Sequence, residues 1–302
     1  MKNSYLAHGK VILMGEHAVV YGYDALALPL KSLQIRTTVE RAAEMWMATA
    51  KYHGPFWAAP AEYDGLKYVV RTMLTKAASQ QPLKFTYRGQ IPTKRGLGSS
   101  ASVALATTRV LNDYFKLGLT EAEVIAITNQ AETINHGQAS GLDAATVNSD
   151  HLIFFNQKRG PVALQAELKA SLLIMDTGEL GSTKEAVALV HQQLEQSPAA
   201  ASKLATLGQL ATETKTAWLK QDQQGVGHNF NRAQAILTSL DLSTAKIAEL
   251  QKIALSHGAL GFKLSGSGLG GIVIALCKDQ VLARRIATAC QSLVTNSWIE
   301  EI

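Results

Sequence analysis

The sequence predicts an α+β protein of two domains. Its 302 residues are about twice the length of a common single domain. Short strand-like runs alternate with helical stretches up to about residue 165. Long helical stretches and a late pair of strands follow. We therefore expect one domain over 1–165 and a second over 166–302.

Composition is typical of a globular chain with a sizeable core, because 47% of the residues are hydrophobic. Apolar runs such as 272–277 are far shorter than the roughly 20 residues of a membrane span. Cys277 and Cys290 are the only cysteines, so neither a disulfide framework nor a cysteine zinc site is expected. The amino-terminal residues do not resemble a signal peptide. We expect a cytoplasmic protein that does not enter a membrane.

The charge pattern favours a small anionic ligand over a nucleic acid. The net charge is +5, from 29 Lys and Arg against 24 Asp and Glu. These basic residues are scattered and form no continuous run, so no nucleic-acid partner is expected.

The first half of the chain alternates between segments with the hydrophobic periodicity of strands and segments with that of helices. Thr120 and Glu123 form a capping-box signature for a helix that ends near Gly137. Residues 42–65 show no clear period and are expected to form a loop. Strands are expected at 11–14, 18–21, 25–30, 33–40, 83–89 and 152–156, and helices at 66–78 and 99–115.

The second half is mostly helical in pattern. A short buried strand is expected at 171–178. Residues 184–255 read as helices interrupted at Pro198, Gly225 and Gly227. Two strands joined by a glycine turn are expected within 258–277, and a closing helix at 283–293.

The segment 92–106 has the pattern of a phosphate-binding turn. Gly96, Gly98, Ser99 and Ser100 stand directly before a predicted helix, so backbone amides and hydroxyls can face an anion. The segment lacks the GxxxxGK[ST] pattern of a Walker A loop. A plain glycine turn with serine caps is the alternative interpretation.

A literal GxGxxG occurs at Gly266, Gly268 and Gly271. A dinucleotide-binding fingerprint opens a helix, whereas here the β-rich run 272–277 follows. We therefore interpret the segment as a turn that lets backbone approach a ligand or another loop, with a tight hairpin as the alternative.

Two acids could share one pocket. Glu132 lies on one predicted helix face with Asn129 and His136, and Asp143 follows past a short loop. One carboxylate could hold Mg²⁺ and the other serve as general base. Solvated helix caps are the alternative. A hydrolase triad of Ser140, His136 and Asp143 can also be written, but no nucleophile elbow is present.

Lys10, Glu16 and His17 surround the first strand and its exit turn. An exposed lysine and a solvated turn are the simple interpretation. A buried Lys10 ammonium facing Asp143 would instead stabilise an incipient alkoxide.

Together these segments resemble the three motifs of the GHMP kinase superfamily, and within it the mevalonate kinase family. GKVILMGEHAVVYG resembles the first motif, KRGLGSSASVALA the second and KLSGSGLGGIVIA the third. AETINHGQASGLDA and DTGELGSTKEAV are similar to further segments of mevalonate kinases. Ala139 and Ala144 depart from the usual proline and asparagine of that pattern. The resemblance implies an amino-terminal domain like domain 2 of ribosomal protein S5 and a ferredoxin-like carboxyl-terminal domain.

The resemblance also implies residue roles. Asp143 would accept the proton of the substrate hydroxyl, with Lys10 beside it, and Ser100 and Glu132 would bind Mg²⁺. ATP is the implied cosubstrate and mevalonate the implied substrate. The implied ATP-binding residues are Gly96, Leu97, Gly98, Ser99, Ser100 and Ala101, and the implied substrate-side residues are Glu16, His17, Thr183, Gly266 and Gly268, with Gly270 shaping the same loop.

Two other functions stay open. One is a GHMP kinase for another acceptor, such as phosphomevalonate or homoserine. The other is a non-catalytic nucleotide or metabolite sensor, although such a sensor has no use for Lys10, Glu132 and Asp143 together. Members of the family are often dimers, which leaves a homodimer possible.

Overall fold

The computed structural model describes residues 3–137 and 139–302, so Gln138 of the acidic segment lies outside the described residues. The chain divides into two compact units. The first comprises residues up to Lys10, Pro29–Thr93 and Gly98–Asp150. The second comprises Val11–Leu28, Lys94–Leu97 and His151–Ile302. Two long paired strands, β1 (Ser4–Met14) and β2 (Ala25–Arg41), contribute residues to both.

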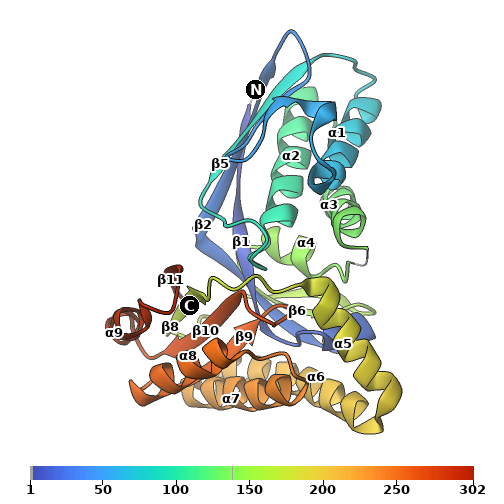
Figure 1. Cartoon of the computed structure of the whole chain (residues 1–302). Helices are drawn as coiled ribbons and strands as arrows, with labels where there is room; N and C mark the ends of the chain where they lie inside the picture. Colours follow the sequence, from blue (N-terminus) through green and yellow to red (C-terminus); the bar gives the residue numbers. More distant parts are fainter. Residues whose placement is uncertain (1–2, 138) are drawn as a thin grey trace. The chain divides into compact units, whose positions relative to one another are not determined.

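In the first unit, strands run in the order β4-β3-β5-β2 and helices pack on one side of them, as Figure 1 shows for α1, α2 and α3 beside β1, β2 and β5. The fourth helix, α4, carries Asp143. The remaining elements of this unit are β3 (Trp46–Ala48), β4 (His53–Pro55), η2 (Phe56–Ala58), η3 (Ala61–Tyr63), α1 (Asp64–Lys76), β5 (Leu83–Gly89), α2 (Ser99–Phe115), α3 (Glu121–His136) and α4 (Leu142–Val147).

Apolar side chains at helical and strand spacing form the core of this unit. Phe85 on β5 packs against Phe56 with ring centroids 5.2 Å apart, and Val69 and Val70 of α1 are fully buried. The capping box at Thr120 is present as predicted, so α3 begins where the sequence places it. The same cluster includes side chains of α2 and α3, which carry Ser100 and Glu132, and Tyr5 of β1 packs against it.

In the second unit, a four-stranded antiparallel sheet has the order β11-β8-β10-β9, and α7 and α8 pack against β9. Figure 1 shows α6, α7 and α8 along one face of these strands. The other strands of this unit extend the start of β2 in the order β2-β6-β7. Its elements are η1 (Ala18–Tyr21), β6 (Leu152–Asn156), β7 (Gly160–Leu164), β8 (Ser171–Asp176), α5 (Thr183–Gln196), α6 (Pro198–Leu219), α7 (Gln223–Ser239), α8 (Ala245–Ser256), β9 (Gly261–Ser265), β10 (Ile272–Cys277), α9 (Gln280–Cys290) and β11 (Asn296–Glu301).

Several sequence-based element predictions were wrong. Residues 18–21 form a turn of 3₁₀ helix, not a strand, because His17 and Gly22 flank them with positive φ. The two strands expected at 25–30 and 33–40 are one strand, β2. The expected loop at 42–65 holds β3, β4 and two 3₁₀ turns. Gly225 and Gly227 do not interrupt a helix, since α7 runs through both.

No helix among the described residues is long and apolar enough to cross a bilayer.

Candidate active site

A buried ammonium and a carboxylate meet in the first unit. Nζ of Lys10, near the middle of β1, lies 3.0 Å from Oδ2 of Asp143 at the start of α4. The Lys10 side chain is 4% exposed, whereas that of Asp143 is 35% exposed. Asp143 therefore presents a carboxylate to solvent while its charge is balanced from inside the protein.

The amino-terminal end of α2 lies against the same lysine. Gly98 caps the helix with φ +74° and no side-chain cap bond. A Cβ on Gly98 would lie 2.8 Å from Cγ of Lys10, so glycine is required for this close approach. The Ser102 hydroxyl donates to the carbonyl of His8 and fixes the first turn of α2 to β1.

Ser100 and Glu132 are brought together as the sequence predicts. The Ser100 hydroxyl interacts with the Glu132 carboxylate and accepts a hydrogen bond of 2.8 Å from Nδ2 of Asn135. Oδ1 of the Asn135 amide accepts from the backbone of Gly65 at 3.0 Å. The sequence analysis missed Asn135, although its spacing of three from Glu132 places both on one face of α3.

Glu132 is a buried acid with an altered proton affinity. Burial raises its pKa to about 7, helped by the charge of Asp143 and opposed by Ser100 and Lys10. Its Oε1 atom has no hydrogen-bond partner among the described residues. His136 lies 3.6 Å away, but burial lowers the pKa of its imidazole, so this contact is not an ion pair at neutral pH.

These residues fit a magnesium ion better than a transition metal. Among the described residues, no group of three or more His, Cys, Asp and Glu side chains has the geometry of a metal site. Mg²⁺ needs only one or two protein carboxylates, because water and substrate phosphates complete its shell. The unbonded oxygen of Glu132 and the nearby Ser100 hydroxyl match that requirement.

In the second unit, two predicted residues, His17 and Thr183, contact Ser267 in the glycine segment. Nε2 of His17 lies 2.9 Å from the Ser267 carbonyl, and Oγ1 of Thr183 lies 3.3 Å from its hydroxyl. Burial lowers the pKa of His17, so its imidazole is neutral at pH 7 and donates this bond from Nε2. Ser267 itself, between Gly266 and Gly268, was missed.

Glu16 forms a fully buried ion pair with Lys263 of β9, and both side chains are 0% exposed. Burial lowers the pKa of Lys263, whereas the Glu16 charge opposes that shift. In this structure the Glu16 carboxylate therefore faces a protein cation, and its predicted place on the substrate side stays a prediction.

The remaining predicted residues lie where glycine segments turn. Gly266 and Gly268 join the antiparallel strands β9 and β10, so the segment opens no helix and the rejection of a dinucleotide fingerprint is confirmed. A Cβ on Gly268 would lie 2.6 Å from the carbonyl of Leu242, and one on Gly270 would lie 2.8 Å from Cβ of Glu179. The remaining four residues of the second motif differ in burial: Gly96 is exposed, Ser99 at the start of α2 is half-buried, and Leu97 and Ala101 are buried.

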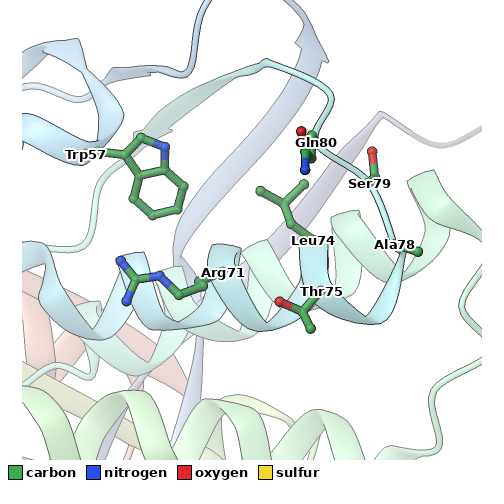
Figure 2. A pocket seen from close by; sticks show the side chains of 7 residues that line it. All are labelled: Trp57, Arg71, Leu74, Thr75, Ala78, Ser79 and Gln80. Atoms are coloured by element: carbon green, nitrogen blue, oxygen red, sulfur yellow. The ribbon is translucent and has the colours of Figure 1, made fainter.

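Two other features contribute nothing to this chemistry. The Ser140 hydroxyl accepts a hydrogen bond from the backbone of Leu142, which gives it a role at the start of α4 rather than as a nucleophile. A hollow of about 640 Å³ in the first unit lies beside Trp57 and Arg71, as Figure 2 shows. None of the predicted site residues lines it.

Comparisons with known proteins give a consistent result. Residues 66–149 match the GHMP kinases N terminal domain, and residues 214–296 match the GHMP kinases C terminal model. The mevalonate kinase of Pyrococcus furiosus is 30% identical over 335 residues, covering 100% of this chain and 96% of that protein.

Solved structures agree in fold. The crystal structure of L. major mevalonate kinase in complex with R-mevalonate has a TM-score of 0.84 and 25% identity, with 100% of this chain and 96% of that chain covered. A Streptococcus pneumoniae phosphomevalonate kinase has a TM-score of 0.83 at 17% identity, with 99% of each chain covered. The second likeness shows only the fold, so fold alone does not select the acceptor.

Proposed function

Since this chain belongs to the mevalonate kinase family of the GHMP kinases, we propose that it transfers the γ-phosphoryl group of ATP to the 5-hydroxyl of (R)-mevalonate. The product is 5-phosphomevalonate, an intermediate of the mevalonate route to isoprenoids. The observation that carries the chemical part of the proposal is the Lys10–Asp143 pair at 3.0 Å, beside the start of α2.

Asp143 is the proposed base. Its half-buried carboxylate can accept the hydroxyl proton as the oxygen attacks the γ-phosphorus. The Lys10 ammonium would then stabilise negative charge on the attacking oxygen and on the phosphoryl group. The two residues divide the work, since Lys10 supplies charge and Asp143 supplies the proton acceptor.

ATP and Mg²⁺ are assigned to the start of α2 and to Glu132. The uncapped first turn of α2, with Gly98, Ser99, Ser100 and Ala101, offers backbone amides to phosphate oxygens. Glu132 and Ser100 would hold Mg²⁺. When bound, the ion neutralises phosphate charge and orients the transferring group.

Residues of the second unit are assigned to mevalonate. We propose that the exposed hydroxyl of Thr183 donates a hydrogen bond on the substrate side, and that Nδ1 of the neutral His17 imidazole, whose Nε2 already donates to Ser267, accepts one there. Glu16, Gly266 and Gly268 shape this part of the protein, and Gly96 and Leu97 lead the chain into the phosphate-binding turn.

An ADP-release assay with separate acceptors tests this proposal. Mevalonate, phosphomevalonate, homoserine and galactose would each be supplied with ATP, with and without Mg²⁺. Turnover on mevalonate alone, lost on chelation, is expected. Turnover on phosphomevalonate or homoserine alone would contradict the acceptor assignment, and ATP binding without turnover on any acceptor would indicate a sensor.

A further inference from the structure

Arg95 precedes the phosphate-binding turn, and its guanidinium is held at two points. Its Nε lies 3.1 Å from Oδ2 of Asp176, and its Nη1 donates 3.0 Å to the carbonyl of Glu179. The Arg95 side chain is 18% exposed, and that of Asp176 is 3% exposed. All three residues belong to the second unit. The planar fork of arginine suits this two-point attachment, which a lysine would make only in part.

Both acceptors are themselves fixed. Asp176 ends β8, a central strand of its sheet, and its other oxygen accepts from the backbone of Gly178 at 2.9 Å. The Glu179 carbonyl also accepts from the backbone of Gly271 at 3.0 Å. Arg95 thus joins the second motif to the turn after β8. Through the Glu179 carbonyl it is also connected to Gly271, at the end of the third motif's glycines.

The backbone on both sides of Arg95 has a positive φ. Lys94 has φ 60°, in the left-handed region that non-glycine residues rarely adopt. Gly96 has φ 81°, and a Cβ placed on it would meet nothing within 4 Å. Leu97, which is buried, is the next side-chain anchor before the helix. The Arg95 attachment therefore selects the conformation of residues 94–96.

We propose that Arg95 is a positioning residue for the nucleotide. By holding Asp176 and the Glu179 carbonyl, it fixes the path of residues 94–97 and so the direction of the backbone amides of the phosphate-binding turn that lead into α2. Replacement of Arg95 should therefore raise KM for ATP and leave KM for the acceptor nearly unchanged. This inference rests on the proposed function, in which that turn binds the ATP phosphates.

An alternative role is direct contact between the guanidinium and a phosphate oxygen. Replacement of Asp176 distinguishes between the two roles. If Arg95 acts through its attachment, loss of the Asp176 charge weakens ATP binding. If Arg95 acts on phosphate, loss of Asp176 frees the guanidinium and leaves ATP binding unchanged or stronger.

The experiment measures KM for ATP, KM for mevalonate and the urea unfolding midpoint of Arg95→Gln, Arg95→Lys, Asp176→Asn and the double variant. We expect Arg95→Gln to raise KM for ATP at least about tenfold, with KM for mevalonate changed less than about twofold. Arg95→Lys should recover part of the loss, and Asp176→Asn should resemble Arg95→Gln. The double variant should be no worse than either single variant.

Arg232→Gln is the matched control, because Arg232 forms a half-exposed ion pair of 2.6 Å with Glu213, and its partners Glu213 and Asn229 belong to none of the three motifs. Its kinetics should equal those of the unaltered protein. Equal changes in both KM values, or an unchanged KM for ATP in Arg95→Gln, would overturn the inference. If Asp176→Asn does not fold, the comparison of Arg95→Gln with Arg95→Lys still decides, because unchanged ATP kinetics in both would refute it.

Failure of this inference is distinguishable from failure of the proposed function. If the unaltered protein binds no ATP by calorimetry, the proposed function fails. If it binds ATP and phosphorylates mevalonate while Arg95→Gln does so equally well, only the positioning role fails.

Discussion

The two acids of the first unit differ in character because their immediate surroundings differ. Asp143 is 35% exposed and has a buried ammonium 3.0 Å away. Glu132 is 4% exposed, and its burial raises its pKa to about 7. The exposed carboxylate of Asp143 can reach a substrate hydroxyl, whereas Glu132, which is costly to ionise, gains most from a bound cation.

Replacement of Asp143 tests the first role. Asp143→Asn keeps the size of the side chain but removes the proton acceptor, so kcat should fall by about 10²–10⁴-fold. ATP affinity, measured by calorimetry, should stay within about twofold. Asp150→Asn, at an exposed position shortly after α4, is the control and should retain full turnover. Near-normal kcat in Asp143→Asn would refute the base assignment.

Replacement of Glu132 tests the second role without any assay of activity. Below pH 4.5 the acid is protonated in the folded and the unfolded chain, so it does not affect stability. Between pH 4.5 and about 7 the unfolded chain loses this proton first, so folding becomes less favourable as pH rises. The full penalty, at most ~3 kcal/mol, is present above pH 7.

Glu132→Gln should therefore raise the free energy of unfolding at pH 8 in the absence of Mg²⁺, and change it little at pH 4.5. Urea titrations at the two pH values measure the difference. Glu44→Gln, at an exposed position, should show no such pH-dependent gain. Equal effects of Glu132→Gln at both pH values would contradict the burial argument.

At the scale of elements, close backbone approaches explain why certain glycines stand inside helices. A Cβ on Gly227 of α7 would lie 2.4 Å from the carbonyl of Leu260, just before β9. The corresponding atom on Gly225 would meet the carboxylate of Asp222, which is the end of a side chain. The Leu260 carbonyl belongs to the main chain and cannot move aside, whereas the Asp222 side chain can rotate.

Gly227→Ala should destabilise the protein by about 1–3 kcal/mol, although alanine favours a helix by about 1 kcal/mol. Gly225→Ala, two positions away in the same helix, should cost less, about 1 kcal/mol or under, because Asp222 can rotate away and gives up only its capping hydrogen bond to residue 225. Thermal unfolding of the two variants side by side measures the contrast. A Gly227→Ala variant as stable as the unaltered protein would show that α7 and β9 can separate without cost.

Local sequence patterns predict helices and strands well. They do not predict features that depend on packing between distant segments. The strand at 83–89 and the helix at 99–115 have the predicted bounds, because alternation and helix formers act within one segment. Gly227 of α7 could not be interpreted from sequence, since the close approach that requires it comes from Leu260, more than thirty residues away. The strand β11 was also missed, since its pairing with β8 joins distant segments.

The candidate site follows the same rule. Lys10, Asp143, Ser100 and Glu132 were predicted from motifs that resemble a family, and the first unit brings each pair together. Asn135 lies in the family-like segment 131–144, but the resemblance gave it no role, and only its contact with Ser100 shows one. The partner of Glu16, Lys263, lies 247 positions later, so no local pattern connects the two.

At the scale of the whole molecule, the carboxyl-terminal residues complete the second unit. Strand β11 pairs with β8 from Asn296 opposite Asp176 to Glu301 opposite Ser171, and Ile302 exchanges two backbone hydrogen bonds with Ala170. Loss of β11 would expose one edge of β8, a strand whose six residues are all buried.

Truncation after Thr295 should therefore prevent soluble expression or abolish cooperative unfolding, as followed by circular dichroism on heating. Ser297→Ala, an exposed position within β11, is the control and should leave the unfolding midpoint unchanged. A truncated protein with an unaltered midpoint would show that β8 needs no neighbour on that side.

The second unit includes Val11–Leu28, although the rest of it lies largely after His151. The backbone of Ile12 is bonded to the hydroxyl of Ser265, 253 positions away. During translation at about 5–20 residues per second, the end of β1 must wait roughly 10–50 s for these partners to leave the ribosome. The nascent chain thus carries the end of β1 without its Ser265 partner through most of its synthesis, so its yield should depend on chaperones that bind early.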